Sequence, residues 1–393
     1  MNSYSTDNTD IDDAGLLEYA ASLGYGISPA TQSPMSDSIN LGPQDVSGDS
    51  NEVHSDEHSA VRISVMNDYI NNTMQKEIAE FARNGNLKSG YANLDAITNL
   101  YPGLYFIGAI SSLGKTTFIH QMADQMAANG QHVLFFSLEQ STLELASKSL
   151  ARIQAHKNRI IAMTSLQIRK HGTDPRVAEA VSEYSKFAEN VTIVECSFRA
   201  SIEDIAACIN DYTAKHEQKP VVMIDYLQVI QAPKDSRLTT KDLIDSYVRR
   251  LKQLQEDNKL TMIVVSSLNR QNYMSLVDFE SFKETGGIEY TADVVWGLQL
   301  QVLHDELFNE QHKLNEKRTA IRSAKAATPR KVELVCLKNR FGISSYECRF
   351  DYYPANDYFI PDMTDIDVNA AAAADKDPDG FQQLPPGIET PFD

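Results

Sequence analysis

The sequence has few cysteines and no long apolar segment. Its four cysteines, Cys196, Cys208, Cys336 and Cys348, are too few for a disulfide framework and form no C-x-x-C pair. No histidine lies close in sequence to either pair, so reduced cysteines are favoured over a zinc site. No apolar run approaches the ~18–20 residues of a membrane span, and no signal-type segment opens the chain. We therefore expect a cytoplasmic protein with no membrane partner.

Basic residues are absent from the first sixty positions. Residues 1–60 contain 11 Asp and Glu side chains and no Lys or Arg, and residues 362–393 contain 8 acidic side chains and one lysine. The formal charge of −18 therefore lies in these two segments, and the region between them is neutral overall. Both segments have few bulky apolar residues, so we expect disordered acidic tails. The neutral centre can still carry a basic channel for a polyanion.

Between the tails, the pattern is that of one α/β domain. A linker helix is expected over residues 61–88, and its apolar face could pack on its own domain or on a neighbouring subunit. From residue 89 to 361, short strands that are apolar on both faces alternate with helices, which predicts a mainly parallel central sheet. The expected strands are 104–109, 132–137, 191–195, 221–230, 260–266 and 292–301, the helices are 115–129, 140–155, 201–216 and 239–258, and a C-terminal hairpin pairs 332–337 with 345–351.

The strongest local motif is the segment 108–117, Gly-Ala-Ile-Ser-Ser-Leu-Gly-Lys-Thr-Thr, which follows a strand and opens a helix. This is the context of a P-loop, where backbone N–H groups and a helix N-terminus hold the phosphates of ATP. Lys115 is expected to reach the β- and γ-phosphates, and the Thr116 hydroxyl to ligate Mg²⁺. Ala109 replaces the usual first glycine, which is tolerable if its φ is negative. The expected nucleotide-binding residues are Ser111, Ser112, Leu113, Gly114, Lys115, Thr116 and Thr117.

Two acidic residues stand at the ends of expected strands. Asp225 follows four apolar strand residues, which would deliver its carboxylate to the carboxyl edge of the sheet. Because buried strand aspartates are rare without a counter-ion, we expect Asp225 to complete a Mg²⁺ site with Thr116. Glu139 follows the strand 132–137 and is the best candidate for the base that activates water. A helix N-cap acid is the alternative interpretation of Glu139.

Six motifs together resemble the RecA-like motor domain of DnaB-type replicative helicases, in the family's order and spacing across about residues 62–360. The resemblance implies a RecA-like P-loop ATPase that forms a hexameric ring, hydrolyses Mg-ATP and separates duplex DNA during replication. It also implies 5′–3′ movement on single-stranded DNA. The chain is similar to variants in phages and mobile elements, including the helicase halves of primase–helicase fusions. The six motifs are Ser89–Asp95, Ser111–Thr117, Phe136–Glu139, Asp225–Gln228, Phe282–Gly286 and Lys338–Gly342.

The resemblance also assigns roles to single residues. Glu139 stands where the family has its catalytic glutamate. Lys338 and Arg340 stand where it has residues that reach the neighbouring subunit's γ-phosphate, and a cation delivered in this way is worth ~10³–10⁵ in rate. A solvated hairpin tip is the alternative for these two residues. The loop that faces the central channel and holds the DNA backbone is matched by Lys283, Glu284 and Gly286, although an ordinary polar loop is also possible.

Other features leave partners and function open. Implied partners are primase, a loader and a single-strand-binding protein, and residues 388–393 resemble the acidic tip of the last or are a plain disordered tail. Lys234, Arg237 and Lys241 could line the channel, whereas residues 313–331 favour a solvated helix. The alternatives to a helicase are a RecA-like DNA-dependent ATPase that does not unwind, in recombination or regulation, and an ATP-gated replication scaffold.

Overall fold

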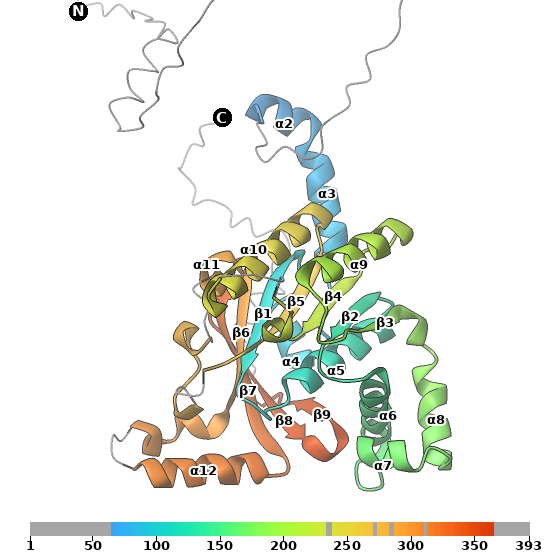
Figure 1. The fold of residues 1–393 in the computed structure, drawn as a ribbon, viewed down its shortest axis with the longest axis vertical. Coiled ribbons are helices and arrows are strands. Elements are labelled where there is room, and N and C mark those ends of the chain that lie inside the picture. The colour runs from blue at the N-terminus through green and yellow to red at the C-terminus, as the bar shows by residue number, and fades with distance from the viewer. Residues whose placement is uncertain (1–63, 233–237, 270–272, 283–286, 310–312, 365–393) are drawn as a thin grey trace, which may run out of the picture. The chain divides into compact units, whose positions relative to one another are not determined.

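The computed structural model describes residues 64–232, 238–269, 273–282, 287–309 and 313–364, all in one unit that begins at Ser64. Its centre is a nine-stranded sheet with the order β3-β2-β4-β5-β1-β6-β7-β8-β9 (Figure 1). The first six of these strands are parallel, and β7, β8 and β9 continue the sheet in antiparallel pairs. The α/β fold with a mainly parallel sheet is therefore confirmed. The tails predicted to be disordered lie outside the described residues, except for 362–364.

All six expected parallel strands are present. The strand expected over 221–230 stops at Asp225, and a 3₁₀ turn over Leu227–Val229 follows it, so that prediction was too long. The expected hairpin is present with longer strands, whereas β9 was not predicted. The strands are β1 Gly103–Ala109, β2 Val133–Ser137, β3 Val191–Glu195, β4 Val221–Asp225, β5 Thr261–Ser267, β6 Val294–Leu300, β7 Arg330–Asn339, β8 Glu347–Tyr353 and β9 Tyr358–Pro361.

The four helices predicted between strands are confirmed within a few residues, but the linker helix is broken. It forms two helices, α2 and α3, because Thr73 departs from helical geometry at φ −119°. None of the helices in the described part of the chain is both long and apolar enough to cross a membrane. The helices are α2 Met66–Asn72, α3 Met74–Asn84, α4 Ala92–Asp95, α5 Lys115–Ala128, α6 Thr142–Asn158, α7 Ser165–Lys170, α8 Pro175–Tyr184, α9 Ile202–Lys215, α10 Thr240–Asn258, α11 Gly287–Thr291 and α12 Leu314–Ala326.

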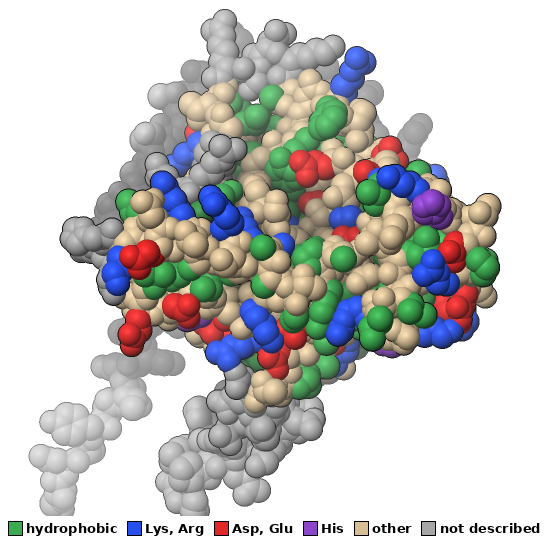
Figure 2. Space-filling view, turned by 90° about the horizontal axis from the view of Figure 1, so that it is seen from below, with side chains coloured by type: hydrophobic (Ala, Val, Ile, Leu, Met, Phe, Trp, Pro, Cys, Tyr) green, Lys and Arg blue, Asp and Glu red, His purple; other side chains and the backbone are tan. Residues whose placement is uncertain are grey.

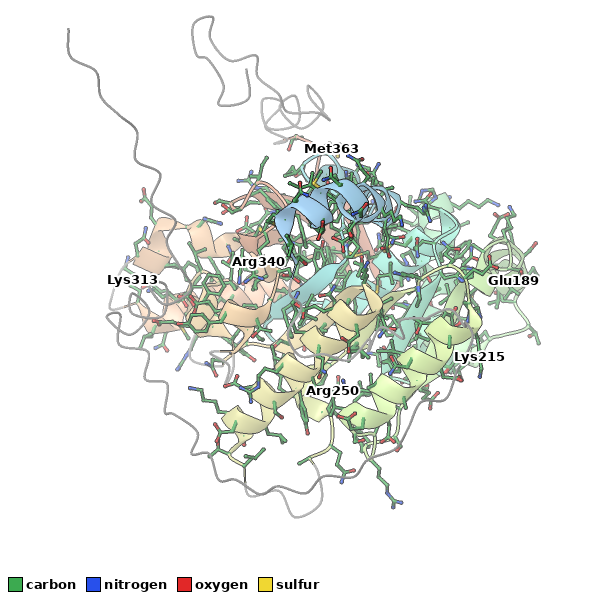
Figure 3. All side chains as sticks on the ribbon, turned by 90° about the horizontal axis from the view of Figure 1, so that it is seen from above. Glu189, Lys215, Arg250, Lys313, Arg340 and Met363 are labelled. Atoms are coloured by element: carbon green, nitrogen blue, oxygen red, sulfur yellow. The ribbon has the colours of Figure 1, made fainter. Side chains whose placement is uncertain are left out.

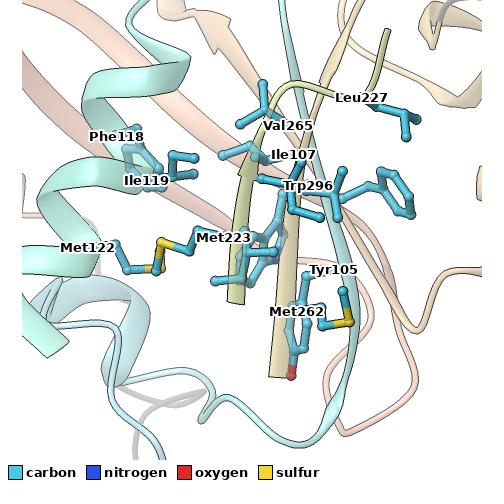
Figure 4. Close-up of a cluster of buried hydrophobic side chains, with 14 of the residues drawn as sticks. Tyr105, Ile107, Phe118, Ile119, Met122, Met223, Leu227, Met262, Val265 and Trp296 are labelled. Carbon is cyan, nitrogen blue, oxygen red and sulfur yellow. The ribbon is translucent and has the colours of Figure 1, made fainter. Parts of the chain in front are cut away.

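The core lies between the parallel strands and the helices that cover them. Every residue of β1, β2, β4 and β6 is buried, as the apolar pattern of these segments predicts for strands covered on both faces. Figure 4 shows the side chains of one part of this core, where Tyr105 and Trp296 pack with ring centroids 5.3 Å apart. Such burial makes the carboxyl ends of β1, β2 and β4 a rigid base for the loops that follow them.

Candidate nucleotide site and a separate basic hairpin

The loop after β1 has the backbone that phosphate binding requires. Ala109 is the last residue of β1 and is not among the non-glycine residues with positive φ, so the condition for replacing the usual glycine is met. Ser112 and Gly114 do have positive φ, at 65° and 98°, and turn the chain into α5. At Gly108, a Cβ atom would lie 2.6 Å from the Leu268 side chain, so this glycine allows close packing beneath the loop.

The loop, β2 and β4 together border a cavity of about 330 Å³ at the carboxyl edge of the sheet. Figure 2 views the molecule from below, and on that face Lys, Arg, Asp and Glu side chains surround a hollow. The side chain of Leu113 is fully buried and does not line the cavity. The structure thus brings together the other residues predicted for a nucleotide, which are Ser111, Ser112, Gly114, Lys115, Thr116, Thr117, Glu139 and Asp225.

Lys115 and Asp225 carry opposite charges in a largely desolvated part of the cavity. Lys115 donates from Nζ to the carbonyl of Ala109 at 2.9 Å, and burial lowers its pKa although the nearby Asp225 carboxylate opposes the shift. Burial raises the pKa of Asp225 to about 6, and a hydrogen bond from the Thr116 side chain partly offsets this. Oδ2 of Asp225 is buried and has no hydrogen-bond partner among the described residues. An orphaned carboxylate oxygen beside a threonine hydroxyl fits a hard cation such as Mg²⁺.

Glu139 lies at the mouth of the same cavity. The backbone N–H of Leu138 donates to the carbonyl of Asp225 at 2.9 Å, which fixes the end of β2 against the end of β4. Glu139 itself is exposed and contacts Tyr226, whose pKa is raised mainly by burial and further by the Glu139 carboxylate. An exposed carboxylate at this position can accept a proton from a water molecule that approaches the cavity.

Several cationic contacts to the loop were missed by sequence reasoning. Arg330, the first residue of β7, donates to the carbonyl of Ser112 at 2.7 Å, and Lys325 of α12 donates to the carbonyl of Ser111 at 3.2 Å. The helix expected over 313–331 is present as α12, but it is not simply solvated, because Lys317 is also buried and donates to a backbone carbonyl. These contacts join segments about 200 residues apart, and no local sequence signal indicates them.

A second group of missed residues borders the other side of the loop. Lys148 of α6 places Nζ 3.4 Å from both the Thr117 hydroxyl and the Asp357 carboxylate. Tyr352 also lines the cavity, and the Arg330 guanidinium lies 5.4 Å from the centre of its ring. The nucleotide cavity is therefore completed by α6 and the C-terminal strands as well as by the P-loop.

Lys338 and Arg340 lie at the opposite edge of the sheet from the cavity. Arg330 contacts the P-loop, and Arg340 follows ten residues later, about 30 Å away at roughly 3.3 Å per strand residue. Arg340 lies one residue beyond the end of β7, so the two cations are not held on one strand face as predicted. Instead both contact α11, where Lys338 donates to the carbonyl of Glu289 at 2.6 Å. Figure 3 labels Arg340 on this side of the molecule, near α3.

The residues predicted to contact DNA are not part of this description. Lys283, Glu284 and Gly286 lie outside the described residues, as do Lys234 and Arg237. Lys241 is described and is an exposed residue of α10.

Comparison with known proteins gives relatives of one kind. The chain is 24% identical over 285 residues to a "Probable replicative DNA helicase" of Trieres chinensis, covering 70% of this chain and 58% of that protein. It is 26% identical over 232 residues to the "Replicative DNA helicase DnaB" of Helicobacter pylori, covering 56% of this chain and 45% of that protein. The chain thus spans about half the length of these curated relatives.

Two solved structures share the fold. A structure of the ATPase domain of a phage helicase superposes with a TM-score of 0.59 at 21% identity, covering 76% of this chain and 99% of that one. "The Structure Of A DnaB-Like Replicative Helicase And Its Interactions With Primase" gives 0.58 at 21% identity, covering 76% and 67%. Residues 86–354 match the family model described as "DnaB-like helicase C terminal domain". The P-loop, the acidic residues at the ends of β2 and β4 and the separate basic hairpin thus belong to a member of the DnaB-like helicase C-terminal domain family, with its RecA-like ATPase fold.

Proposed function

We propose that this chain is an ATP-dependent DNA helicase motor of the DnaB type. In this proposal it assembles as a homo-hexamer, hydrolyses ATP at the interfaces between subunits and moves 5′–3′ on single-stranded DNA during replication. One observation carries the proposal, namely that Arg340 and the nucleotide cavity lie at opposite edges of the sheet, about 30 Å apart along β7. A guanidinium at that distance cannot reach its own chain's γ-phosphate, so it can serve only a neighbour's.

The residues of one chain would divide the work with those of the next. Lys115 and the N-terminus of α5 hold the phosphates, Thr116 and Asp225 hold Mg²⁺, and Glu139 accepts the proton of the attacking water. Bound Mg²⁺ would supply positive charge against the phosphate oxygens. Arg340 and Lys338 of the adjacent subunit would then stabilise the charge on the transferring group.

The DNA contacts are proposed for Lys283, Glu284 and Gly286, with Lys234, Arg237 and Lys241 as weaker candidates. A lysine and a glycine amide suit phosphate oxygens, which carry no base sequence, and a translocating motor requires this indifference to sequence. Primase, a loader and a single-strand-binding protein are the proposed partners.

A second candidate is a DNA-dependent ATPase that does not unwind, and Arg330 favours it. This arginine contacts the loop within the same chain, so it could provide a catalytic cation without a neighbour. An enzyme of that kind would hydrolyse ATP at a rate per chain that does not depend on protein concentration. The third candidate, a replication scaffold, would lose its role on deletion of residues 1–60 and 362–393, whereas a motor would keep its unwinding.

The deciding experiment is unwinding of a forked DNA duplex, measured beside the native mass of the assembly. We expect strand displacement that requires ATP and Mg²⁺, a hexameric mass, and specific activity that rises with protein concentration. Lys115→Ala is the matched inactive control. DNA-stimulated hydrolysis without displacement would select the second candidate, and full hydrolysis by a monomer would refute the shared site.

A further inference from the structure

The trans-acting cations of the proposed function are held in place by a defined group of residues. Arg340 donates from one guanidinium nitrogen to Oδ1 of Asp293 at 3.0 Å and from another to the carbonyl of Tyr290 at 3.3 Å. The backbone N–H of Arg340 also donates to the backbone carbonyl of Asp293 at 3.0 Å. Lys338 is held beside it by the carbonyl of Glu289. Both cations therefore sit on the C-terminal end of α11, where helix carbonyls lack partners within the helix.

Asp293 is itself fixed by the centre of the sheet. Its Oδ2 accepts hydrogen bonds from the backbone N–H of Leu104 and from Nζ of Lys252, each at 2.8 Å. Its own backbone N–H donates to the carbonyl of Leu104 at 2.9 Å. The Asp293 side chain is only 6% exposed, whereas that of Arg340 is 50% exposed. One edge of the guanidinium is thus attached to β1 and α10 through Asp293, and the rest points into solvent.

We propose that Asp293, seated on β1 and α10, is the positioning residue that aims Arg340 at the nucleotide of the neighbouring subunit. This inference rests on the proposed function and deepens it. A long arginine side chain at an exposed hairpin tip has many rotamers, and fixing it before the neighbour's nucleotide arrives removes that entropic cost. The described structure gives partners to two of the five guanidinium N–H groups, so donors remain for a phosphate.

Lys252 gives the arrangement its electrostatic logic. A carboxylate that paired with Arg340 alone would cancel the charge that the transition state needs. Lys252 places a second cation on the other oxygen of Asp293, so the group of three carries one net positive charge. The local field stays positive, and accordingly the pKa of Lys338 is lowered by burial and then by the Arg340 charge.

The test is Asp293→Asn, compared with Arg340→Ala in the full chain. Asparagine keeps one acceptor oxygen, which cannot serve both Leu104 and Arg340. We expect kcat for DNA-free ATP hydrolysis to fall about 10²-fold, the typical cost of a small misplacement of a catalytic group. The affinity for fluorescent ADP should not change, because the P-loop of each chain is intact. Glu203→Gln, which removes an exposed carboxylate paired with Arg250 at 3.0 Å, is the matched control and should keep full activity.

Mixing with Lys115→Ala subunits separates positioning from a general structural defect. A Lys115→Ala chain has no working P-loop but donates an intact hairpin, so in equal mixtures about one interface in four is complete. We expect both Arg340→Ala and Asp293→Asn to regain hydrolysis in these mixtures, because each defect lies in the donated hairpin.

Each other outcome is decisive. If Arg340→Ala regains activity and Asp293→Asn does not, or if Asp293→Asn alone is fully active, the positioning role is overturned and the shared site survives. If neither mixture regains activity, the shared site itself is wrong and the positioning role falls with it. Should Asp293→Asn fail to fold in a thermal melt, Asp293→Ser replaces it, because serine can still accept from Leu104 but is too short to hold Arg340.

Discussion

Replacing Asp225 by asparagine should stabilise the nucleotide-free protein while abolishing hydrolysis. The side chain of this aspartate is almost fully buried, and burial raises its pKa from 3.8 to about 6. The folded state therefore resists ionisation that the unfolded chain accepts freely. Over this difference in pKa, the free energy of unfolding falls by about 3 kcal/mol, at 1.36 kcal/mol for each factor of ten in proton affinity. An uncharged asparagine avoids this loss, apart from the cost of its own buried amide.

The sign of the pH dependence follows from the raised pKa. Below pH 3.8 the carboxyl is protonated in both states, and its favourable contribution to stability is complete. As the pH rises from about 4 to about 6, the unfolded state ionises first and that contribution is lost; above pH 6 the loss is constant. The advantage of Asp225→Asn should therefore grow between pH 4 and pH 6 and then stay level.

The assay is urea denaturation of the wild type and Asp225→Asn in EDTA at pH 4.5, 6 and 7.5. Asp204→Asn is a control of opposite sign, since hydrogen bonds from Ser201 lower the pKa of Asp204. That variant should lose stability relative to the wild type as the pH rises. A difference between Asp225→Asn and the wild type that does not change with pH, or a less stable variant at pH 7.5, would show that Asp225 is not held against its charge.

Three further predictions test other parts of the site. Lys115→Ala should abolish ATP hydrolysis with an unchanged circular dichroism spectrum, because the charge on the phosphates is lost; residual hydrolysis near the wild-type rate would contradict the P-loop assignment. Arg340→Ala subunits doped into wild-type rings should lower activity more than in proportion, whereas Arg330→Ala should not be rescued by Lys115→Ala subunits, since its contact is within one chain; simple proportional loss, or rescue of Arg330→Ala, would reverse these roles. Gly108→Ala should destabilise by about 1–3 kcal/mol in urea, because its Cβ would lie 2.7 Å from the Phe282 ring, and an unchanged midpoint would refute the packing argument.

The sequence alone determined the parts of the site that are local. The P-loop needs a glycine-rich turn between a strand and a helix, and those residues are adjacent in the chain, so segment 108–117 was readable as it stands. Asp225 and Glu139 were readable because apolar strands end at or just before them, and the carboxyl ends of parallel strands meet at one edge. The break at Thr73 and the early end of β4 were not, because boundaries depend on packing beyond the segment itself.

The tertiary structure decided which distant residues meet. Arg330 and Lys325 reach the P-loop only because β7 is paired with β6, next to β1, and strand order is not written in any local pattern. The same strand carries Arg340 to the far edge of the sheet, which the sequence could indicate only through family resemblance. Asp293 gave no sequence signal at all, since its role depends on β1, α10 and the end of β7 meeting at one carboxylate. Chemistry confined to one segment is visible in the chain, whereas chemistry shared between segments appears only once the sheet has brought them together.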